Sequence, residues 1–441
     1  MEVLTAAQSE ATQRRVAGAL LARGLSAGDR VALLTSSTGD MLSAVLGALR
    51  VGIVPVLLNA GLLEHERAAL LADADAQLVA DDEELARLVA GPSTDLAPDP
   101  LARPMHYTSG TTGEPKGVWS GVLSEAEAAA LVAEEVDQWG FAADDIHLVC
   151  SPFHHSVAVR FGGGTLLRGG TVVILGRYDA RAAVSAIGRY RPTTSFMVPA
   201  HLQRLFALGD QLDLGSFRLL AHAGAPCAEP LKLQAIEAFG VDRVWEFYGS
   251  TEGQFTACSA TEWLARPGTV GRARAGRVLS VDEEQSIWCE APAHARWSYW
   301  RDADKTAAAW RGRAFTVGDL GRLDDDGYLY LDGRRDDLII TGGVNVYPAE
   351  IEQALLRAPG VLQAAVFGLD DERWGQRVCA AVVGDVDERE LQAHARRSLA
   401  AYKCPKDVYV VDQLPHTSTG KLRRLDVAQS LGLSPTGDCP D

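Results

Sequence analysis

Helical and buried-strand patterns alternate along the first part of this chain, and this alternation constrains the fold more than any other feature. Apolar residues recur at helical spacing over residues 6–23, and a short apolar strand follows at 31–34. The alternation then repeats, with helices expected over 39–51 and 63–73 and strands over 53–58 and 77–80. Strands that alternate with helices pair in parallel and are covered by those helices. The pattern therefore predicts an α/β fold around a mostly parallel sheet.

The charge balance disfavours two classes of partner. The 441 residues include 42 basic and 58 acidic side chains, which gives a formal net charge of −16. So acidic a chain is unsuited to binding nucleic acid or an anionic membrane. An anionic substrate would have to meet local positive charge.

The cysteines and the apolar runs predict a cytoplasmic protein. The seven cysteines are scattered without a Cys-x-x-Cys pair, so we expect reduced thiols rather than disulfides or a metal cluster. The N-terminus shows no basic segment followed by an apolar one. No apolar run reaches the length that spans a membrane, so no membrane partner is expected.

The run from Tyr107 to Val118, which reads YTSGTTGEPKGV, predicts a phosphate-binding loop. Glycines let backbone N–H groups approach an anion, hydroxyls donate further hydrogen bonds, and a lysine adds a point charge. The P-loop of nucleoside triphosphatases needs Ser or Thr directly after its lysine, whereas Gly117 follows Lys116 here. The run is therefore a different kind of phosphate loop, and its expected contacts are Thr108, Ser109, Gly110, Thr111, Thr112, Gly113 and Lys116.

Residue for residue, this run resembles the phosphate loop of the adenylate-forming (AMP-binding) superfamily. That superfamily contains acyl-CoA synthetases, peptide-synthetase adenylation domains and luciferases. Further segments resemble the family's motifs in the same order, as far as Arg424. The resemblance implies a large N-terminal body, residues 1–333, of mixed, mostly parallel sheets flanked by helices plus a β-rich subdomain. It also implies a small mobile α/β C-terminal domain, residues 334–441, that swings about a hinge.

The resemblance assigns residues to ATP and Mg²⁺. In the segment YGSTE, residues 248–252, the aromatic ring would lie against adenine, and Glu252 would ligate Mg²⁺ through a hard carboxylate oxygen. Asp319 would accept hydrogen bonds from the ribose, although Val317 stands where the family usually has Thr. Arg334 would contact ribose and phosphate, and Asp336 would be the hinge pivot. The remaining expected nucleotide contacts are Gly224, Ala225, Pro226, Phe247, Tyr248, Gly249, Thr251 and Lys421.

The segment from Pro152 to Arg160 resembles the luciferase version of one wall of the acid-binding pocket. The resemblance maps the pocket histidine onto His155, and the segment lacks the aspartate with which amino-acid-activating members pair the α-ammonium. Arg160 has two readings: it pairs with a second carboxylate, a polar acid or a small inorganic anion, or it lies on the outer face of a helix in a surface ion pair. The expected pocket residues are His154, His155, Val157, Arg160, Ala223 and Gly249.

The loop that contains Lys421 matches the superfamily's catalytic lysine loop. The implied reaction is attack of a carboxylate on the α-phosphorus of ATP, which gives acyl-AMP and pyrophosphate. Two anions must meet, so the site needs electrostatic stabilisation. The expected catalytic residues are Thr108, His155, Glu252 and Lys421. Residues 342–352 resemble the acyl-CoA synthetase version of the following segment, which favours coenzyme A as the acceptor.

Two alternatives remain open at this stage, and so does the oligomeric state. The chain could be a stand-alone ligase that loads a carrier protein, or that activates an unusual small acid such as nitrite for direct transfer. It could also be a non-catalytic protein that binds adenine nucleotides. The presence of Glu252, Asp319, Arg334 and Lys421 together counts against this last possibility.

Overall fold

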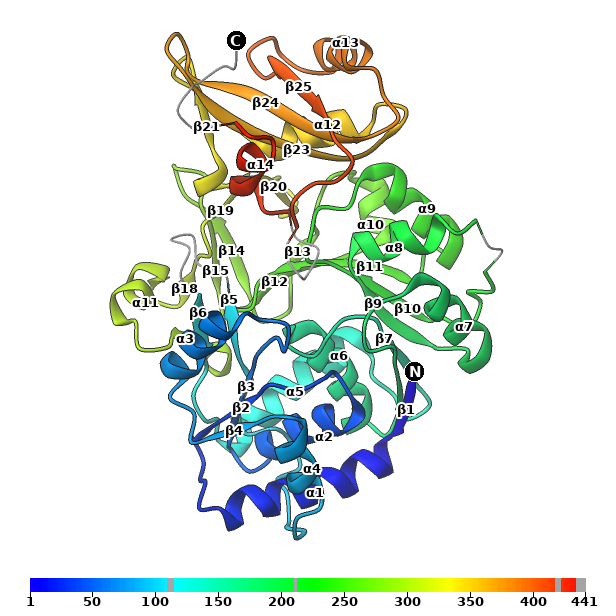
Figure 1. Cartoon of the computed structure of the whole chain (residues 1–441), viewed down its shortest axis with the longest axis vertical. Helices are drawn as coiled ribbons and strands as arrows, with labels where there is room; N and C mark the ends of the chain where they lie inside the picture. Colours follow the sequence, from blue (N-terminus) through cyan, green and yellow to red (C-terminus); the bar gives the residue numbers. More distant parts are fainter. Residues whose placement is uncertain (109–114, 210–211, 417–421, 434–441) are drawn as a thin grey trace.

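The computed structural model describes residues 1–108, 115–209, 212–416 and 422–433 (Figure 1). Its first sheet has six strands in the order β16-β6-β5-β3-β2-β4. The four strands β4, β2, β3 and β5 are parallel, and β6 and β16 run antiparallel to their neighbours. The bounds are β2 Arg30–Leu33, β3 Val54–Leu57, β4 Leu78–Ala80, β5 Met105–Thr108, β6 Lys116–Trp119 and β16 Ser298–Tyr299.

The second sheet has eight strands in the order β1-β8-β7-β9-β10-β11-β12-β13. Its middle strands, from β8 to β11, are parallel, and antiparallel strands close both edges. The bounds are β1 Glu2–Thr5, β7 Ile146–Val149, β8 Thr171–Ile174, β9 Thr194–Met197, β10 Leu219–His222, β11 Val244–Gly249, β12 Gln254–Ser259 and β13 Arg272–Ala273. The expected sheets, parallel at the centre and mixed at the edges, are confirmed.

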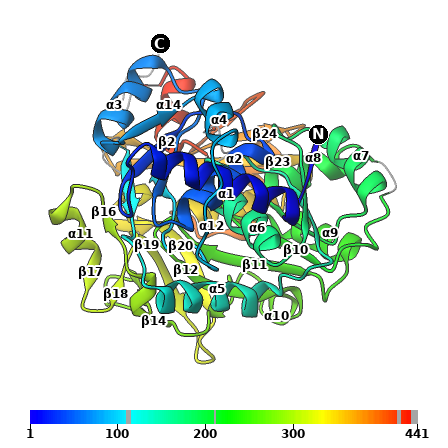
Figure 2. The same ribbon diagram turned by 90° about the horizontal axis from the view of Figure 1, so that it is seen from below.

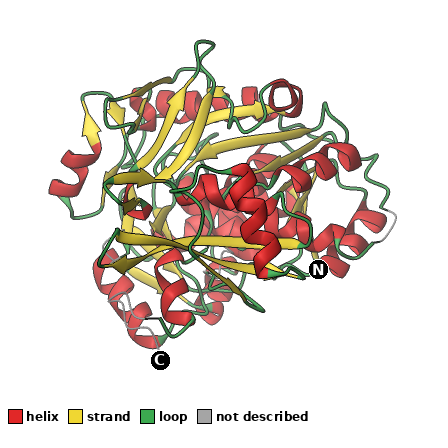
Figure 3. Cartoon of the chain, turned by 90° about the horizontal axis from the view of Figure 1, so that it is seen from above, coloured by secondary structure: helices red, strands yellow, loops and turns green. Residues whose placement is uncertain are grey.

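Helices flank both sheets, as Figure 3 shows from above. They are α1 Ala6–Ala22, α2 Gly39–Leu49, α3 Glu64–Ala74, α4 Asp82–Val89, α5 Glu125–Trp139, α6 Ser156–Leu167, α7 Ala180–Tyr190, α8 Pro199–Phe206, α9 Glu229–Phe239 and α10 Ala260–Ala265. The helices α1, α2 and α6 pack against one another (Figure 2), and one apolar core joins them to strands of both sheets. The two sheets therefore form a single body.

A β-rich part follows, as expected between residues 269 and 330. It contains β14 Val278–Val281, β15 Ile287–Glu290, β17 Trp310–Arg311, β18 Ala314–Phe315 and the antiparallel pair β19 Asp319–Leu323 and β20 Leu329–Arg334, with the short helix α11 Ala303–Ala309. Its core is aromatic, with Phe315 packed against Phe255, Trp297 and Trp310. Because Phe255 belongs to β12, this core joins the β-rich part to the eight-stranded sheet.

The C-terminal residues form a separate five-stranded sheet at the top of Figure 1. Its elements are β21 Ile339–Thr341, β22 Val344–Val346, α12 Pro348–Leu356, β23 Val361–Asp371, β24 Gly375–Gly384, α13 Glu388–Ser398, β25 Asp407–Val410 and α14 Arg424–Ser430. Two apolar clusters of its own hold it together. Among its contacts with the large body, Gln203 Nε2 donates to the Leu362 carbonyl at 3.2 Å. In the described part of the chain, no helix is both long and apolar enough to cross a membrane.

The structure differs from the sequence-based expectations mainly in short or polar elements. The expected strands at 364–367 and 378–383 are the centres of a longer hairpin, β23 and β24. Helix α4 was not expected, although Asp81 caps it by accepting a hydrogen bond from the Glu84 backbone N–H. The helix α7 and the last helix, α14, were not expected either. These helices are short, so each offers only about two or three turns in which an apolar period could show.

Candidate active site

The strands β5 and β6 hold the two ends of the expected phosphate loop side by side. Thr108 and Lys116 are register partners in this antiparallel pair, and the Thr108 hydroxyl donates to the Lys116 carbonyl at 3.5 Å. The intervening Ser109, Gly110, Thr111, Thr112 and Gly113 lie outside the described residues. The hairpin explains why the loop begins and ends where the sequence indicates.

Lys116, Tyr299 and Glu252 form a chain of contacts beside this hairpin. Lys116 Nζ lies 5.1 Å from the centroid of the Tyr299 ring, and the Tyr299 hydroxyl donates to Glu252 Oε1 at 3.0 Å. Burial, with Glu252 beside it, raises the pKa of Tyr299 far above its ordinary range, so the phenol stays protonated as a donor. The Glu252 residue is only 6% exposed. Its carboxylate is thus fixed next to the expected phosphate site.

Glu252 is the expected magnesium ligand, and the residues around it fit that role. Across the described residues, no group of three or more His, Cys, Asp or Glu side chains is arranged to hold a metal ion by itself. Mg²⁺ in nucleotide enzymes is usually held by one or two carboxylates together with substrate phosphates. A buried Glu252 beside the phosphate-loop strands supplies such a carboxylate.

Tyr248, Asp319 and Arg334 form the expected nucleoside side of the site. The Tyr248 hydroxyl donates to Asp319 Oδ2 at 2.6 Å, and Arg334 Nε donates to Asp319 Oδ1 at 3.0 Å. Asp319 raises the pKa of Arg334, and Glu252 contributes to the same shift. The nucleoside residues and the metal ligand are therefore within electrostatic reach of one another.

Adjacent residues of β11 point to opposite faces of the sheet, and this separates Phe247 from Tyr248. Phe247 packs in an aromatic cluster, with ring centroids 5.4 Å from Trp139 and 6.3 Å from Phe161. Ala223 is buried in the same cluster, and Val157 packs against it. Phe247, expected among the nucleotide contacts, thus lies with residues expected in the acid pocket.

Glycines shape the turns at the strand ends nearby. Gly249 ends β11, and a Cβ there would lie 2.7 Å from the Gly253 carbonyl oxygen, so only glycine fits. Gly224 follows β10 with a positive φ of 89°. Ala225 and Pro226 continue this turn towards α9. Turns at the carboxyl ends of parallel strands are where α/β sheets bind ligands.

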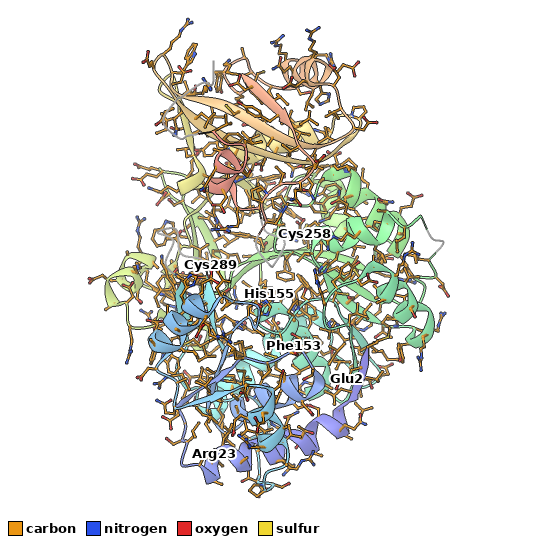
Figure 4. The ribbon with its side chains drawn as sticks, viewed as in Figure 1. Glu2, Arg23, Phe153, His155, Cys258 and Cys289 are labelled. Atoms are coloured by element: carbon orange, nitrogen blue, oxygen red, sulfur yellow. The ribbon has the colours of Figure 1, made fainter. Side chains whose placement is uncertain are left out.

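The expected pocket histidines lie at the start of α6. The rings of His154 and His155 are 4.2 Å apart between centroids, and His155 is the residue that precedes the helix. In Figure 4, His155 lies at mid-height in the large body, below the C-terminal sheet. Burial lowers the pKa of His154 to about 4, which leaves it neutral at physiological pH.

Sequence reasoning did not single out His106, which lies on β5 and contacts the backbone of His154. Its Nδ1 is 3.0 Å from the His154 carbonyl, and a neutral ring would donate there. Burial, opposed by the hydrogen bond to the His154 carbonyl and assisted by the charge of Arg103, lowers the pKa of His106 to about 4. His106 thereby connects β5 of the phosphate hairpin to the pocket segment.

Arg160 does not lie on the outer face of its helix, which corrects the surface reading. Its side chain is 20% exposed, and its Nε lies 3.8 Å from Glu135 Oε2. Its guanidinium lies over the Phe247 ring, 5.0 Å from the centroid. The sequence placed a cation near the expected pocket but could not show these partners, because α5 and β11 are distant along the chain.

The hinge and lysine loop are described only in part. Asp336 belongs to the short 3-10 helix Arg335–Asp337, and its side chain lies outside the described residues, as does Lys421. Sequence reasoning missed Arg424, which donates to Asp337 Oδ2 at 2.6 Å and to both oxygens of Glu352 at 2.6 and 2.8 Å. Arg424 therefore fastens the end of the lysine loop to α12 and to the hinge segment.

Comparison with known proteins agrees with this geometry. The sequence model described as "AMP-binding enzyme" matches residues 2–99 and 91–288, and the model "AMP-binding enzyme C-terminal domain" matches residues 350–421. A 2-succinylbenzoate–CoA ligase of Geobacillus sp. (strain WCH70) is 33% identical, over 92% of this chain and 88% of that protein.

Solved structures of two proteins extend the likeness to the whole fold. One is the o-succinylbenzoate CoA synthetase of Bacillus subtilis in complex with the acyl-adenylate intermediate, with a TM-score of 0.83 and 28% identity over 98% of this chain and 94% of that one. The same enzyme has been solved with ATP and a magnesium ion, with a TM-score of 0.82 and 27% identity over 96% and 94%. The other is the amide bond synthetase McbA of Marinactinospora thermotolerans, with a TM-score of 0.83 and 28% identity over 96% and 94%.

Proposed function

This chain belongs to the family of AMP-binding enzymes, and from that premise we propose that it is an ATP-dependent acid–CoA ligase. Such an enzyme joins a carboxylic acid to AMP with release of pyrophosphate and then transfers the acyl group to coenzyme A. The observation that carries the proposal is the convergence of Glu252, Asp319 and Arg334 beside the phosphate hairpin. The likeness to an acyl-adenylate complex over nearly the whole chain supports it.

We assign the roles within this site as follows. Asp319 and Arg334 bind the ribose side of ATP, with Tyr248 against the adenine. The loop from Thr108 to Lys116 binds the phosphates, and Glu252 holds Mg²⁺, which supplies positive charge against the phosphate oxygens. Lys421 stabilises the negative charge that develops during adenylation, and His155 with Val157 and Ala223 lines the acid pocket.

A change of domain orientation between the two half-reactions is part of the proposal. We place the boundary between residues 333 and 334, just before the last residue of β20. Asp336 would be the pivot. We also place the protein in the cytoplasm, which the six unpaired cysteines of the described residues support.

The test is pyrophosphate release from ATP and Mg²⁺ with a panel of aliphatic, aromatic, dicarboxylic and amino acids plus nitrite, each with and without CoA. Mass spectrometry of the products then identifies a thioester. Release with an acid and formation of its CoA thioester is the expected result. Release with none of the acids would contradict the proposal.

A second candidate is direct transfer of the activated acid to an amine or to a carrier protein. The likeness to an amide bond synthetase favours it. It predicts that pyrophosphate release does not depend on CoA and that the product is an amide or an acylated carrier protein. Adding a simple amine in place of CoA separates the two candidates in the same assay.

A further inference from the structure

Four arginines and two glutamates form a network between the large sheet and the β-rich part. Arg274 Nη1 contacts Glu135 Oε1 at 3.0 Å, and Arg277 Nη2 contacts Glu134 Oε2 at 3.0 Å. The side chains of Arg274 and Arg277 are only 2% and 6% exposed. The two glutamates are neighbours on α5, which Figure 2 shows running beside β12. Each glutamate is thus already paired with one buried arginine.

The other two arginines of the network, Arg103 and Arg160, have weaker partners. Within the described residues, Arg160 Nε has no hydrogen-bond partner, and its nearest carboxylate oxygen is the 3.8 Å contact with Glu135. Glu135 Oε1 accepts from Gln254 and Arg274, whereas Glu135 Oε2 makes no hydrogen bond within the described residues and is the oxygen that faces Arg160. Arg103 makes one long hydrogen bond, from Nη2 to the Thr251 carbonyl at 3.4 Å. Four guanidiniums face two carboxylates here, with Glu135 shared between Arg274 and Arg160, so the network carries more positive charge than its glutamates neutralise.

A half-buried guanidinium with unused donors is costly unless something completes its hydrogen bonds. Glu252 also interacts electrostatically with Arg103, but it accepts from Tyr299 and is the expected magnesium ligand. A chain with a net charge of −16 has many acidic residues available to neutralise such a site. The spare charge is therefore suited to a ligand that brings its own anionic group.

The position of the spare charge identifies which ligand that is. The Arg160 guanidinium lies 5.0 Å from the Phe247 ring centroid, and Val157 and Ala223 pack around the same ring. Arg103 reaches Thr251, the neighbour of Glu252. The two cations thus lie between the acid pocket and the reacting end of the nucleotide site. A planar guanidinium matches a carboxylate in two parallel hydrogen bonds.

We infer that the acid which this enzyme activates carries a second carboxylate, and that Arg160, assisted by Arg103, binds it. The inference rests on the proposed acid-activating function and specifies its substrate class as dicarboxylic acids. Arg160 is then a determinant of specificity, while the first carboxylate of the substrate is adenylated.

The test compares each dicarboxylic acid with its own monoamide, which keeps the size and one carboxylate but removes the second charge. The series runs from malonate to suberate and includes the benzene dicarboxylates. Pyrophosphate release with saturating ATP gives kcat/KM for both members of each pair. For the best pair, we expect the wild type to prefer the dicarboxylate by about 10- to 100-fold, the worth of a charge-assisted hydrogen-bond pair.

Substitutions of Arg160 test whether this residue causes the preference for the dicarboxylate. Arg160→Gln should lower kcat/KM for the dicarboxylate by about 10- to 100-fold and change that for the monoamide by less than about threefold. Arg160→Lys keeps the positive charge but loses the paired N–H donors of the guanidinium, so it should retain part of the preference for the dicarboxylate. Arg168→Gln is the matched control, because Arg168 is an exposed residue at the end of the same helix. It should behave as the wild type does.

Each other outcome counts against the inference. A wild type that prefers monoamides, simple monocarboxylic acids or nitrite overturns it. An equal loss of kcat/KM for the dicarboxylate and its monoamide in Arg160→Gln overturns it too, because Arg160 would then stabilise the fold. A higher KM for ATP in this variant also overturns it, because Arg160 would then contribute to nucleotide binding. If Arg160→Gln does not fold, the inference is tested by the ratio of kcat/KM for each dicarboxylate to that for its monoamide, measured in the wild type and in Arg160→Lys. Release with no acid at all overturns the proposed function, and this inference falls with it.

Discussion

The hydroxyl of Tyr248 donates a 2.6 Å hydrogen bond to Oδ2 of Asp319. This bond joins β11 of the eight-stranded sheet to β19 of the β-rich part, and Arg334 on β20 binds the other oxygen of Asp319. Burial raises the pKa of the Asp319 carboxyl, while Arg334 and the Tyr248 hydroxyl oppose that shift. The carboxylate is thus held in place before any nucleotide arrives.

Asp319→Asn should raise the KM for ATP by about 10- to 100-fold, because a charge-assisted hydrogen bond is worth about 1.5–3 kcal/mol. Tyr248→Phe is the matched variant: it keeps the ring and removes one donor to Asp319, so the KM should rise by less than about tenfold. Pyrophosphate release against ATP concentration measures both. An unchanged KM in Asp319→Asn would remove Asp319 from nucleotide binding.

Lys421→Ala should lower the rate of adenylation by about 100- to 1000-fold while leaving ATP binding nearly unchanged, because its charge is needed most in the transition state. Single-turnover formation of acyl-AMP and equilibrium binding of ATP measure the two effects. Lys406→Ala is the control, since Lys406 is an exposed lysine of the same C-terminal region. Normal acyl-AMP formation in Lys421→Ala would exclude Lys421 from the mechanism.

Arg424→Gln should destabilise the C-terminal region by roughly 2–4 kcal/mol, because it leaves the carboxylates of Glu352 and Asp337 without their cation. Urea unfolding measures this loss. The neighbouring Arg423 makes a surface pair with Asp426, so Arg423→Gln should change stability by less than about 0.5 kcal/mol. Equal stability of the two variants would show that the buried pairs contribute little.

Acid should destabilise the protein partly through His106. Its pKa is about 4 in the folded chain and about 6.5 when unfolded, so the unfolded state binds more protons between these values. As far as His106 is concerned, the free energy of unfolding therefore has its full value above about pH 6.5. It decreases as the pH falls towards 4, by an amount on the order of a few kcal/mol. Urea unfolding at stepped pH measures it.

His106→Gln removes this titrating group, so its stability should fall less steeply than that of the wild type across the same window. His65→Gln changes an exposed histidine on α3 and serves as the control. Identical pH profiles for all three proteins would mean that His106 does not couple to folding.

Much of the fold was predictable from the sequence, because its elements carry local patterns. The helix α5 begins after Ser124, whose hydroxyl and Glu127 form the expected capping box, and α12 spans the expected residues from Pro348 to Leu356. The helices that were missed include α4, α7 and α14, and α4 and α14 are short, with 8 and 7 residues. Their stability comes from packing rather than from periodicity.

The sequence by itself determined the α/β class, and its resemblance to the adenylate-forming superfamily predicted the phosphate loop and the roles of Glu252, Asp319 and Lys421. Both depend on motif spacing and apolar periodicity, which are properties of neighbouring residues. Tertiary structure decided which side chains meet across the fold. It brought Arg160 onto Phe247 and beside Glu135, a carboxylate that Arg160 shares with Arg274, and it placed Arg103 against the Thr251 carbonyl. Such contacts join segments far apart in the chain, and only the packing of helices against sheets creates them.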